Sequence, residues 1–431
     1  MPLLIVLIGI VLLFILIAGF KLNSFISFII VCLFVGIVGG MELQSVIDSI
    51  QTGIGKTLGY LVLILGLGAM LGKLVADSGA AQRITSKLVD KFGVKHIQWA
   101  LVLTGFIVGI PMFYTVGFVI LVPLVFTVAA QTKLPLIYVG LPMLASLSVT
   151  HGFLPPHPAP TAIAVMFGAD IGKTLIYGII IAIPTIIIAG PLFTRTIKNV
   201  NGTPLMEFYN PIILKDEEMP SMANSVFSAL LPVILIGFST IALSVLPSDF
   251  ILNDVIGFIG NPIMAMLISV LVAIYTLGLS RGKKMKELMT SVSTAISSIT
   301  MVLLIIAGAG ALKQILTDSG VSDYIGSLLS DSSISPLILA WLIATVLRIC
   351  VGSATVAGLT AAGIILPMVS TTGVSPELMV IAIGAGSLMC SHVNDGGFWM
   401  FKEYFNLSVK DTLKTWTVME TTVGVLGLVG A

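Results

Sequence analysis

The sequence predicts an all-α polytopic membrane protein built from two inverted repeats. Three observations carry this prediction: long apolar runs, a one-sided distribution of lysine and arginine, and an internal repeat at a fixed offset. The chain has 431 residues, of which 57% are hydrophobic and 10% are charged, and its mean hydropathy is +1.12. Soluble domains are about a quarter charged and under half apolar, so the composition excludes a soluble globular protein.

The apolar runs give the membrane spans. A bilayer core of about 30 Å needs about 20 apolar helical residues. Runs of this kind lie at 2–20, 22–40, 57–76, 136–167, 174–194, 223–246, 256–279, 288–316, 376–400 and 412–430. Two further runs, 97–131 and 335–371, are too long for one helix, so each must turn back on itself. The first run is not expected to be a signal peptide, because no positive charge precedes Lys21.

The positive charges predict the orientation of these spans. If each doubled-back run leaves the membrane on the side it entered, 16 of the 21 Lys and Arg residues fall on one side. Only Lys56 and Lys173 fall on the other side. The positive-inside rule then makes the first side cytoplasmic and places both termini outside. Ten spans with two re-entrant hairpins and fourteen full spans place the charges and the termini on the same sides. The charge distribution therefore does not distinguish between these two topologies.

Other partners and cofactors find no support in the sequence. The net charge of +1 provides no basic field for nucleic acid. The three cysteines, Cys32, Cys350 and Cys390, lie in apolar runs and lack the spacing of a metal site or a disulfide framework. We therefore expect no metal and no cofactor.

The internal repeat has an offset of 241 residues. Asp77-Ser78-Gly79 matches Asp318-Ser319-Gly320, and His151 matches His392. Further matches join residues 84, 86, 88, 117, 135 and 146 to residues 325, 327, 329, 358, 376 and 387. With five spans in each half, the second half is inverted relative to the first. We expect a first repeat at 1–200, a cytoplasmic connector at 201–222 and a second repeat at 223–431. Inverted repeats with interrupted helices are typical of secondary transporters.

Four polar interruptions of the spans are the candidate site. In hydrocarbon, non-helical backbone survives only inside protein or beside a cavity. The doubled runs turn near 109–115 and 350–356, and the spans 136–167 and 376–400 break at 150–161 and 391–397. Half-helices that start at such breaks offer free N–H groups and a partial positive charge to an anion. We expect substrate contacts from these residues: Tyr114, His151, Gly152, Pro155, His157, Thr161, Arg348, Gly352, Ser353, Thr355 and Asn394.

Charged and titratable residues at depth are candidates for both substrate binding and proton coupling. Arg348 could bind a substrate carboxylate or pair internally with Asp395 or Glu420. Asp395 could carry the coupling proton or cap a helix. Glu420 could be a second proton site or a buried structural acid. His392, like His151 and His157, could relay protons or cap the broken backbone.

Several motifs resemble the gluconate permease (gluconate:proton symporter) family over essentially the whole chain. The motifs are Gly152-Phe153-Leu154-Pro155-Pro156-His157-Pro158, Val351-Gly352-Ser353-Ala354-Thr355-Val356-Ala357, Ser391-His392-Val393-Asn394-Asp395, Leu71-Gly72-Lys73 with Ala76-Asp77-Ser78-Gly79, and Phe398-Trp399 with Lys402-Glu403-Tyr404-Phe405-Asn406-Leu407. The resemblance implies re-entrant hairpins at 97–131 and 335–371, broken helices at 136–167 and 376–400, and polar breaks that meet near the membrane midplane.

One position departs from the family pattern. The first hairpin of the family reads Phe-Tyr-Glu before Val-Gly, whereas this chain has Thr115 in place of the acid. If that acid carries the proton in the family, coupling in this chain moves to Asp395 or Glu420 or is lost. Where the family has Asn-Asp-Pro, this chain has Asn394-Asp395-Gly396.

The resemblance implies a secondary transporter of the bacterial cytoplasmic membrane that imports gluconate or a related sugar-acid anion with protons. D-serine and other small carboxylates are alternative substrates, because D-serine carriers are a branch of the family. A mobile domain that carries the hairpins and broken helices would provide alternating access, and a homo-oligomer, most simply a dimer, is expected. A channel would need polar residues along whole helices, and an intramembrane enzyme would need a metal, nucleophile or paired-acid motif. The sequence shows neither, so an enzyme is not expected.

Overall fold

The fold is a bundle of α-helices. The computed structural model describes all residues except 1, 198–199, 201, 204–213, 248 and 321–333. Within the described residues, seven helices are long and apolar enough to cross a membrane, and a pair bent by 110°, Ala80–Phe92 with Val94–Gly109, would make an eighth. The prediction of an all-α polytopic membrane protein is therefore confirmed.

The described residues of the first half form nine α-helices. They are α1 (Pro2–Phe14), α2 (Ser24–Val38), α3 (Leu43–Asp77), α4 (Ala80–Phe92), α5 (Ile97–Gly109), α6 (Tyr114–Thr132), α7 (Leu136–Phe153), α8 (Pro158–Phe167) and α9 (Ile171–Ile187). Short π-helical turns, η1 (Ile15–Gly19) and η3 (Ile188–Leu192), continue α1 and α9.

The second half follows a similar order. Its described helices are α10 (Met222–Val245), α11 (Asn253–Gly260), α12 (Pro262–Ala273), α13 (Met285–Asp318), α15 (Pro336–Val351), α16 (Ala354–Thr371), α17 (Pro376–Leu388), α18 (Gly396–Tyr404), α19 (Val409–Thr412) and α20 (Val418–Gly430). The π-helical turn η5 (Ile274–Gly278) continues α12, and the 3-10 turn η6 (Leu279–Arg281) follows it before α13. A further π-helical turn, η7 (Leu413–Thr417), connects α19 to α20.

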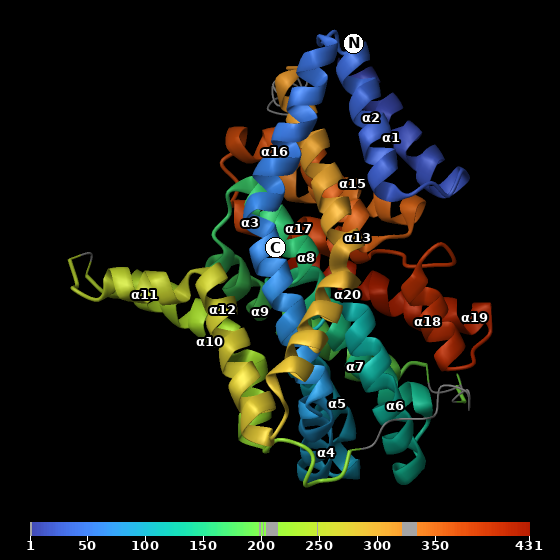
Figure 1. Ribbon diagram of the computed structural model, residues 1–431. Helices are drawn as coiled ribbons and strands as arrows, with labels where there is room; N and C mark the ends of the chain where they lie inside the picture. The colour runs from blue at the N-terminus through green and yellow to red at the C-terminus, as the bar shows by residue number, and fades with distance from the viewer. Residues whose placement is uncertain (1, 198–199, 201, 204–213, 248, 321–333) are drawn as a thin grey trace.

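The two longest helices, α3 and α13, occupy equivalent positions in the repeat and cross each other in opposite directions (Figure 1). Asp77 at the end of α3 accepts a hydrogen bond from Ser291 of α13 at 2.5 Å. Asp318, 241 residues later, accepts the reciprocal bond from Ser49 of α3 at 2.6 Å. This reciprocity is what an inverted pair requires. The sequence matches at 325, 327 and 329 lie outside the described residues.

Helix α3 is longer than the predicted span at 57–76, because it begins at Leu43 and has 35 residues. At a rise of 1.5 Å per residue, such a helix is about 52 Å long and exceeds the bilayer core. The first turns of α3 contain polar residues that lower the local hydropathy, so hydropathy alone did not predict that these turns belong to the helix. They are helical because they pack on α13: a Cβ atom on Gly53 would meet the backbone of Gly310 and Ala311.

The two doubled-back runs form helix pairs that approach from opposite ends of the molecule (Figure 1). Helices α5 and α6 are separated by residues 110–113, and α15 and α16 by residues 352–353. Gly352 has a φ of +78°, a left-handed conformation that glycine adopts without strain. The tips of both pairs lie at the centre of the bundle.

Two further helices are interrupted at the same level. Residues 154–157 separate α7 from α8, and residues 389–395 separate α17 from α18. The first break follows from its prolines, since Pro155, Pro156 and Pro158 cannot donate the backbone hydrogen bonds of a continuous helix. In the second break, the side chain of Asp395 starts α18 by accepting a hydrogen bond from the Gly397 N–H at 2.9 Å.

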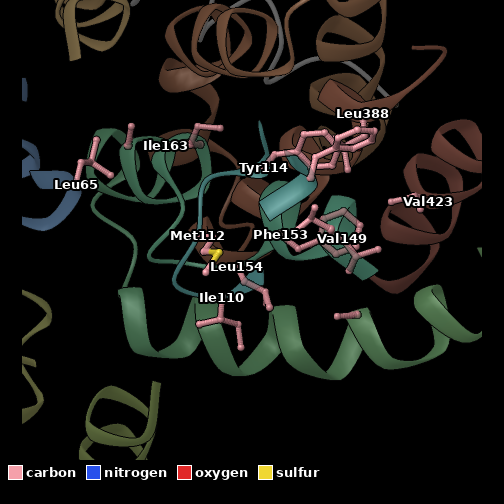
Figure 2. Close-up of a cluster of buried hydrophobic side chains, with 14 of the residues drawn as sticks. Leu65, Ile110, Met112, Tyr114, Val149, Phe153, Leu154, Ile163, Leu388 and Val423 are labelled. Carbon is pink, nitrogen blue, oxygen red and sulfur yellow. The ribbon is translucent and has the colours of Figure 1, made fainter. Parts of the chain in front are cut away.

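A buried apolar cluster fixes the first tip and the first break against the rest of the bundle (Figure 2). It contains Ile110 and Met112 of the tip and Leu154 of the break, all at most 2% exposed. Leu65 of α3, Ile163 of α8, Leu388 of α17 and Val423 of α20 complete the labelled set together with Tyr114, Val149 and Phe153. Six helices thus hold the point where the polar interruptions meet.

Candidate functional site

A cavity of about 410 Å³ lies where the two hairpin tips and the two helix breaks meet. Four α-helices contribute residues at their N-terminal ends to its wall: α6 at Tyr114, α8 at Pro158, α16 at Ala354 and α18 at Gly396. A helix N-terminus carries unsatisfied N–H groups and a partial positive charge. The cavity is therefore suited to an anion.

The four helix starts differ in how many N–H groups they leave free. At α6, the preceding residue Phe113 provides no side-chain cap. At α16, Ser353 accepts only a long hydrogen bond of 3.4 Å from the Val356 N–H. Helix α8 contains Pro158 and Pro160, which have no N–H, and α18 is capped by Asp395. The starts of α6 and α16 are thus the better anion sites.

Arg348 provides the buried cation of the site. Its side chain is 3% exposed, and its Nη2 forms an ion pair with Oδ2 of Asp395. Its Nη1 donates to the backbone carbonyl of Gly352. Both terminal nitrogens therefore have partners inside the protein, and the internal pair is formed with Asp395 rather than with Glu420. Only Nε has no partner.

Asp395 lies at the centre of a polar network in the second break. Besides Arg348, its carboxylate accepts hydrogen bonds from Ser391 and from the Gly397 N–H. Nε1 of Trp416 donates to the Ser391 hydroxyl at 2.7 Å. Asp395 therefore acts as the predicted helix cap and as the counter-ion of Arg348 at the same time.

Glu420 of α20 is the second acid of the cavity. It is 2% exposed, and the hydroxyl of Ser148 on α7 donates to its Oε1. No basic side chain lies within ion-pair distance of it among the described residues. Glu420 is thus a buried carboxyl that a hydroxyl, rather than a cation, holds in place.

Three fully buried polar atoms in the cavity wall have no hydrogen-bond partner among the described residues: Oη of Tyr114, Nδ1 of His151 and Nε of Arg348. The rings of Tyr114 and His151 lie 5.8 Å apart between centroids. Buried polar atoms are normally paired, so each unpaired atom here is a candidate contact for a bound molecule. Within the described residues, no group of three or more His, Cys, Asp or Glu side chains could hold a metal ion.

Comparison with known proteins assigns this architecture to a family. A family model described as GntP family permease matches residues 1–431. The chain belongs to the GntP permease family. It is therefore a membrane permease and not an enzyme, in agreement with the prediction.

Curated relatives match the GntP permease over its whole length. It is 56% identical to a high-affinity gluconate transporter of Escherichia coli K12, and the match covers 100% of this chain and 98% of that protein. It is 52% identical to the Gnt-II system L-idonate transporter of the same organism, with the same coverage. A gluconate permease of Bacillus licheniformis is 51% identical over 99% of this chain and 98% of its own length.

Two solved structures share the fold of this GntP permease. The YdaH transporter of Alcanivorax borkumensis matches with a TM-score of 0.65 at 16% identity and covers 94% of this chain and 96% of its own. MtrF of Neisseria gonorrhoeae matches with a TM-score of 0.66 at 14% identity and covers 94% of both chains. The likeness shows a common fold.

The structure brings most of the predicted site residues of the permease into one cavity wall. Those that line it are Tyr114, Thr115, His151, Arg348, Gly352, Ser353, Thr355, Asn394, Asp395 and Glu420. They come from both repeats and from positions up to 306 residues apart in the sequence, as Tyr114 and Glu420 show.

Five predicted residues lie outside the cavity wall. His157 bonds the carbonyl of Gly109 at 2.8 Å, and His392 bonds the carbonyl of Ile349 at 3.1 Å. Each histidine thus joins a helix break to the hairpin tip of its own repeat. A Cβ atom on Gly152 would meet Leu388, so this glycine allows α7 to approach α17. Pro155 and Thr161 are buried around the first break.

Among the lining residues that were not predicted, two have side chains that form hydrogen bonds in the site, Ser148 and Trp416. Both have a helical relationship to residues that were predicted. Ser148 is three residues before His151, and Trp416 is four residues before Glu420, so each pair shares one face of a helix. That spacing, applied to each deep polar residue, is the signal that would have found them.

Proposed function

We propose that this permease imports gluconate or a related sugar-acid anion, such as L-idonate, together with protons. The relatives named above are gluconate and L-idonate transporters. The observation that carries the proposal is the convergence of four helix N-termini on one cavity. A sugar acid has one carboxylate and a chain of hydroxyls. It requires both a positive electrostatic potential and many small polar groups, and this wall offers both.

The carboxylate is best accommodated at the start of α16. The free N–H groups of this helix end lie beside Ser353 and Thr355, whose hydroxyls can donate further hydrogen bonds. The unpaired Nε of Arg348 belongs to the same wall. Since the terminal nitrogens of Arg348 serve Asp395 and Gly352, the helix end rather than a bidentate arginine provides the main anion contact.

Glu420 is our candidate for the coupling proton. Glu420 lines the same cavity as the start of α16, so an ionised Glu420 repels an anion bound there through the low-dielectric interior. Protonation of Glu420 removes this repulsion, so proton binding and anion binding favour each other. Asp395 is less suited to this role, because it is the counter-ion of Arg348. Thr115, which stands where the family has a glutamate, has no titratable group and cannot carry the proton.

For the transport cycle, we propose that the hairpins and broken helices move together relative to a scaffold formed around α3 and α13. The links from His157 and His392 to the hairpin tips support a common movement of tip and break. The 16-to-2 distribution of positive charge supports a location in the cytoplasmic membrane with both termini outside.

The test is uptake of labelled gluconate into proteoliposomes with and without an inward proton gradient. Wild-type protein should accumulate gluconate only with the gradient, in a saturable manner. Glu420→Gln should still exchange gluconate across the membrane but should not accumulate it. Asp90→Asn is the control, because Asp90 is an exposed acid on α4 that does not line the cavity. Gradient-driven accumulation by Glu420→Gln would rule out Glu420 as the coupling site.

A further inference from the structure

The cavity wall carries two chemically different sets of groups. Arg348 and the start of α16 provide its positive groups. Tyr114 and His151 of the same wall present one buried, unpaired polar atom each. Tyr114 is 9% exposed, and its ring lies 6.0 Å from that of Trp416 between centroids. A phenol that is buried without a partner is costly, unless a bound molecule completes its hydrogen bonding.

The neighbours of Tyr114 and His151 favour a neutral hydroxyl over a carboxylate as their ligand. Trp416 is four residues before Glu420 on the same helical stretch, and Ser148, which holds Glu420, is three residues before His151. A substrate carboxylate near Tyr114 would therefore lie beside the acid of Glu420. A hydroxyl carries no charge, and it can donate and accept at once. It fits both the phenol oxygen and the imidazole nitrogen.

We propose that the Tyr114 hydroxyl and Nδ1 of His151 bind a hydroxyl of the substrate's polyol chain and make the permease selective for polyhydroxylated acids over plain carboxylates. This inference rests on the proposed function. A site with buried polar groups rejects an analogue that lacks the matching hydroxyl, because those groups then stay unpaired. Tyr114 and His151 would thus exclude short or deoxygenated carboxylates that the start of α16 alone would accept.

The test is a competition series. Uptake of labelled gluconate by wild-type protein in proteoliposomes is measured with one unlabelled competitor at a time. The competitors are each monodeoxy gluconate and a plain short carboxylate such as propionate. At least one monodeoxy analogue should compete about 10-fold less well than gluconate, and propionate weaker still. In Tyr114→Phe, that analogue should compete less than about 3-fold less well than gluconate, because the variant has no phenol hydroxyl that stays unpaired. We call this factor of weaker competition the penalty.

Tyr275→Phe is the matched control, since Tyr275 is 64% exposed and does not line the cavity. It should keep the wild-type penalties. If Tyr114→Phe does not yield folded protein, the penalties are measured in His151→Leu instead and compared with those of wild-type protein. Unchanged penalties for every analogue in the folded variants would overturn the inference. Wild-type protein that neither takes up gluconate nor is inhibited by it would overturn the proposed function instead, so the two failures are distinguishable.

Discussion

Arg348 and Asp395 form a buried ion pair that joins the tip of the second hairpin to the second helix break. Arg348 belongs to α15, and Asp395 begins α18, 47 residues later. Asn394 reinforces the junction by donating to the carbonyl of Ile349 at 2.7 Å. Tip and break are thus tied by charge and by backbone contacts, which makes them one structural unit within the site.

Breaking this ion pair should destabilise the permease strongly. Removal of one partner of a buried pair leaves the other charge uncompensated and typically costs about 3–5 kcal/mol. We expect Arg348→Ala and Asp395→Ala to lower the thermal unfolding midpoint in detergent, whereas Arg348→Met with Asp395→Leu should recover part of the loss. Glu403→Gln is the control, because it breaks the exposed pair with Lys402 and should change stability by at most about 1 kcal/mol. Equal midpoints for the single and double variants would contradict this account.

Gly352 should not tolerate a side chain. Its φ of +78° disfavours any other residue by about 1–2 kcal/mol, and a Cβ atom would meet the backbone of Asn394. Gly352→Ala should therefore separate the hairpin tip from the break and abolish gluconate uptake. Gly363→Ala on the same helix pair is the control, because Gly363 lies in α16 with open space around its Cβ position. Normal uptake by Gly352→Ala would show that tip and break need not be in contact.

The sequence was sufficient to predict the hairpins and breaks, because proline, glycine and clustered polar residues interrupt apolar runs for local reasons. It also predicted the repeat; Asp77 and Asp318, which match at the offset, each accept a hydrogen bond from the other long helix. It could not choose between the possible partners of Arg348, because Asp395 and Glu420 were equally deep. Nor could it pair Ser148 with Glu420, which are 272 residues apart. Such contacts depend on how the helices cross, and hydropathy carries no information about crossing.

Arg83 should be essential for holding the connector between the two repeats. It is 7% exposed on α4, and its guanidinium donates to the carbonyl of Pro220 at 2.7 Å and to Oδ1 of Asp216 at 3.0 Å. Arg83→Ala should cost about 1–3 kcal/mol, mainly because the buried carbonyl of Pro220 loses its donor, whereas Asp216 is exposed and can be solvated. Arg83→Lys should recover little, because an ammonium cannot span acceptors that the planar guanidinium reaches.

The measurement for Arg83 is denaturant or thermal unfolding in detergent, followed by limited proteolysis of the connector. The variants should be cleaved faster than wild-type protein near Asp216. Lys87→Ala is the control, since Lys87 is exposed one turn further along α4. Full rescue by Arg83→Lys would mean that charge alone, rather than the shape of the guanidinium, secures the connector.

The reciprocal bonds between α3 and α13 make a prediction about symmetry. Ser49 donates to Asp318 and Ser291 donates to Asp77; the two aspartates match at the offset of 241 residues, and Ser291 lies one residue beyond the position that matches Ser49. Ser49→Ala and Ser291→Ala should each lower the free energy of unfolding by about 1 kcal/mol, and the double variant should lose the sum, because the two sites share no partner. Ser297→Ala on α13 should have almost no effect, since its exposed hydroxyl bonds only the carbonyl of Ser293 in its own helix. A much larger loss at one site, measured by thermal unfolding in detergent, would show that the two ends of the α3–α13 pair are held unequally despite their common geometry.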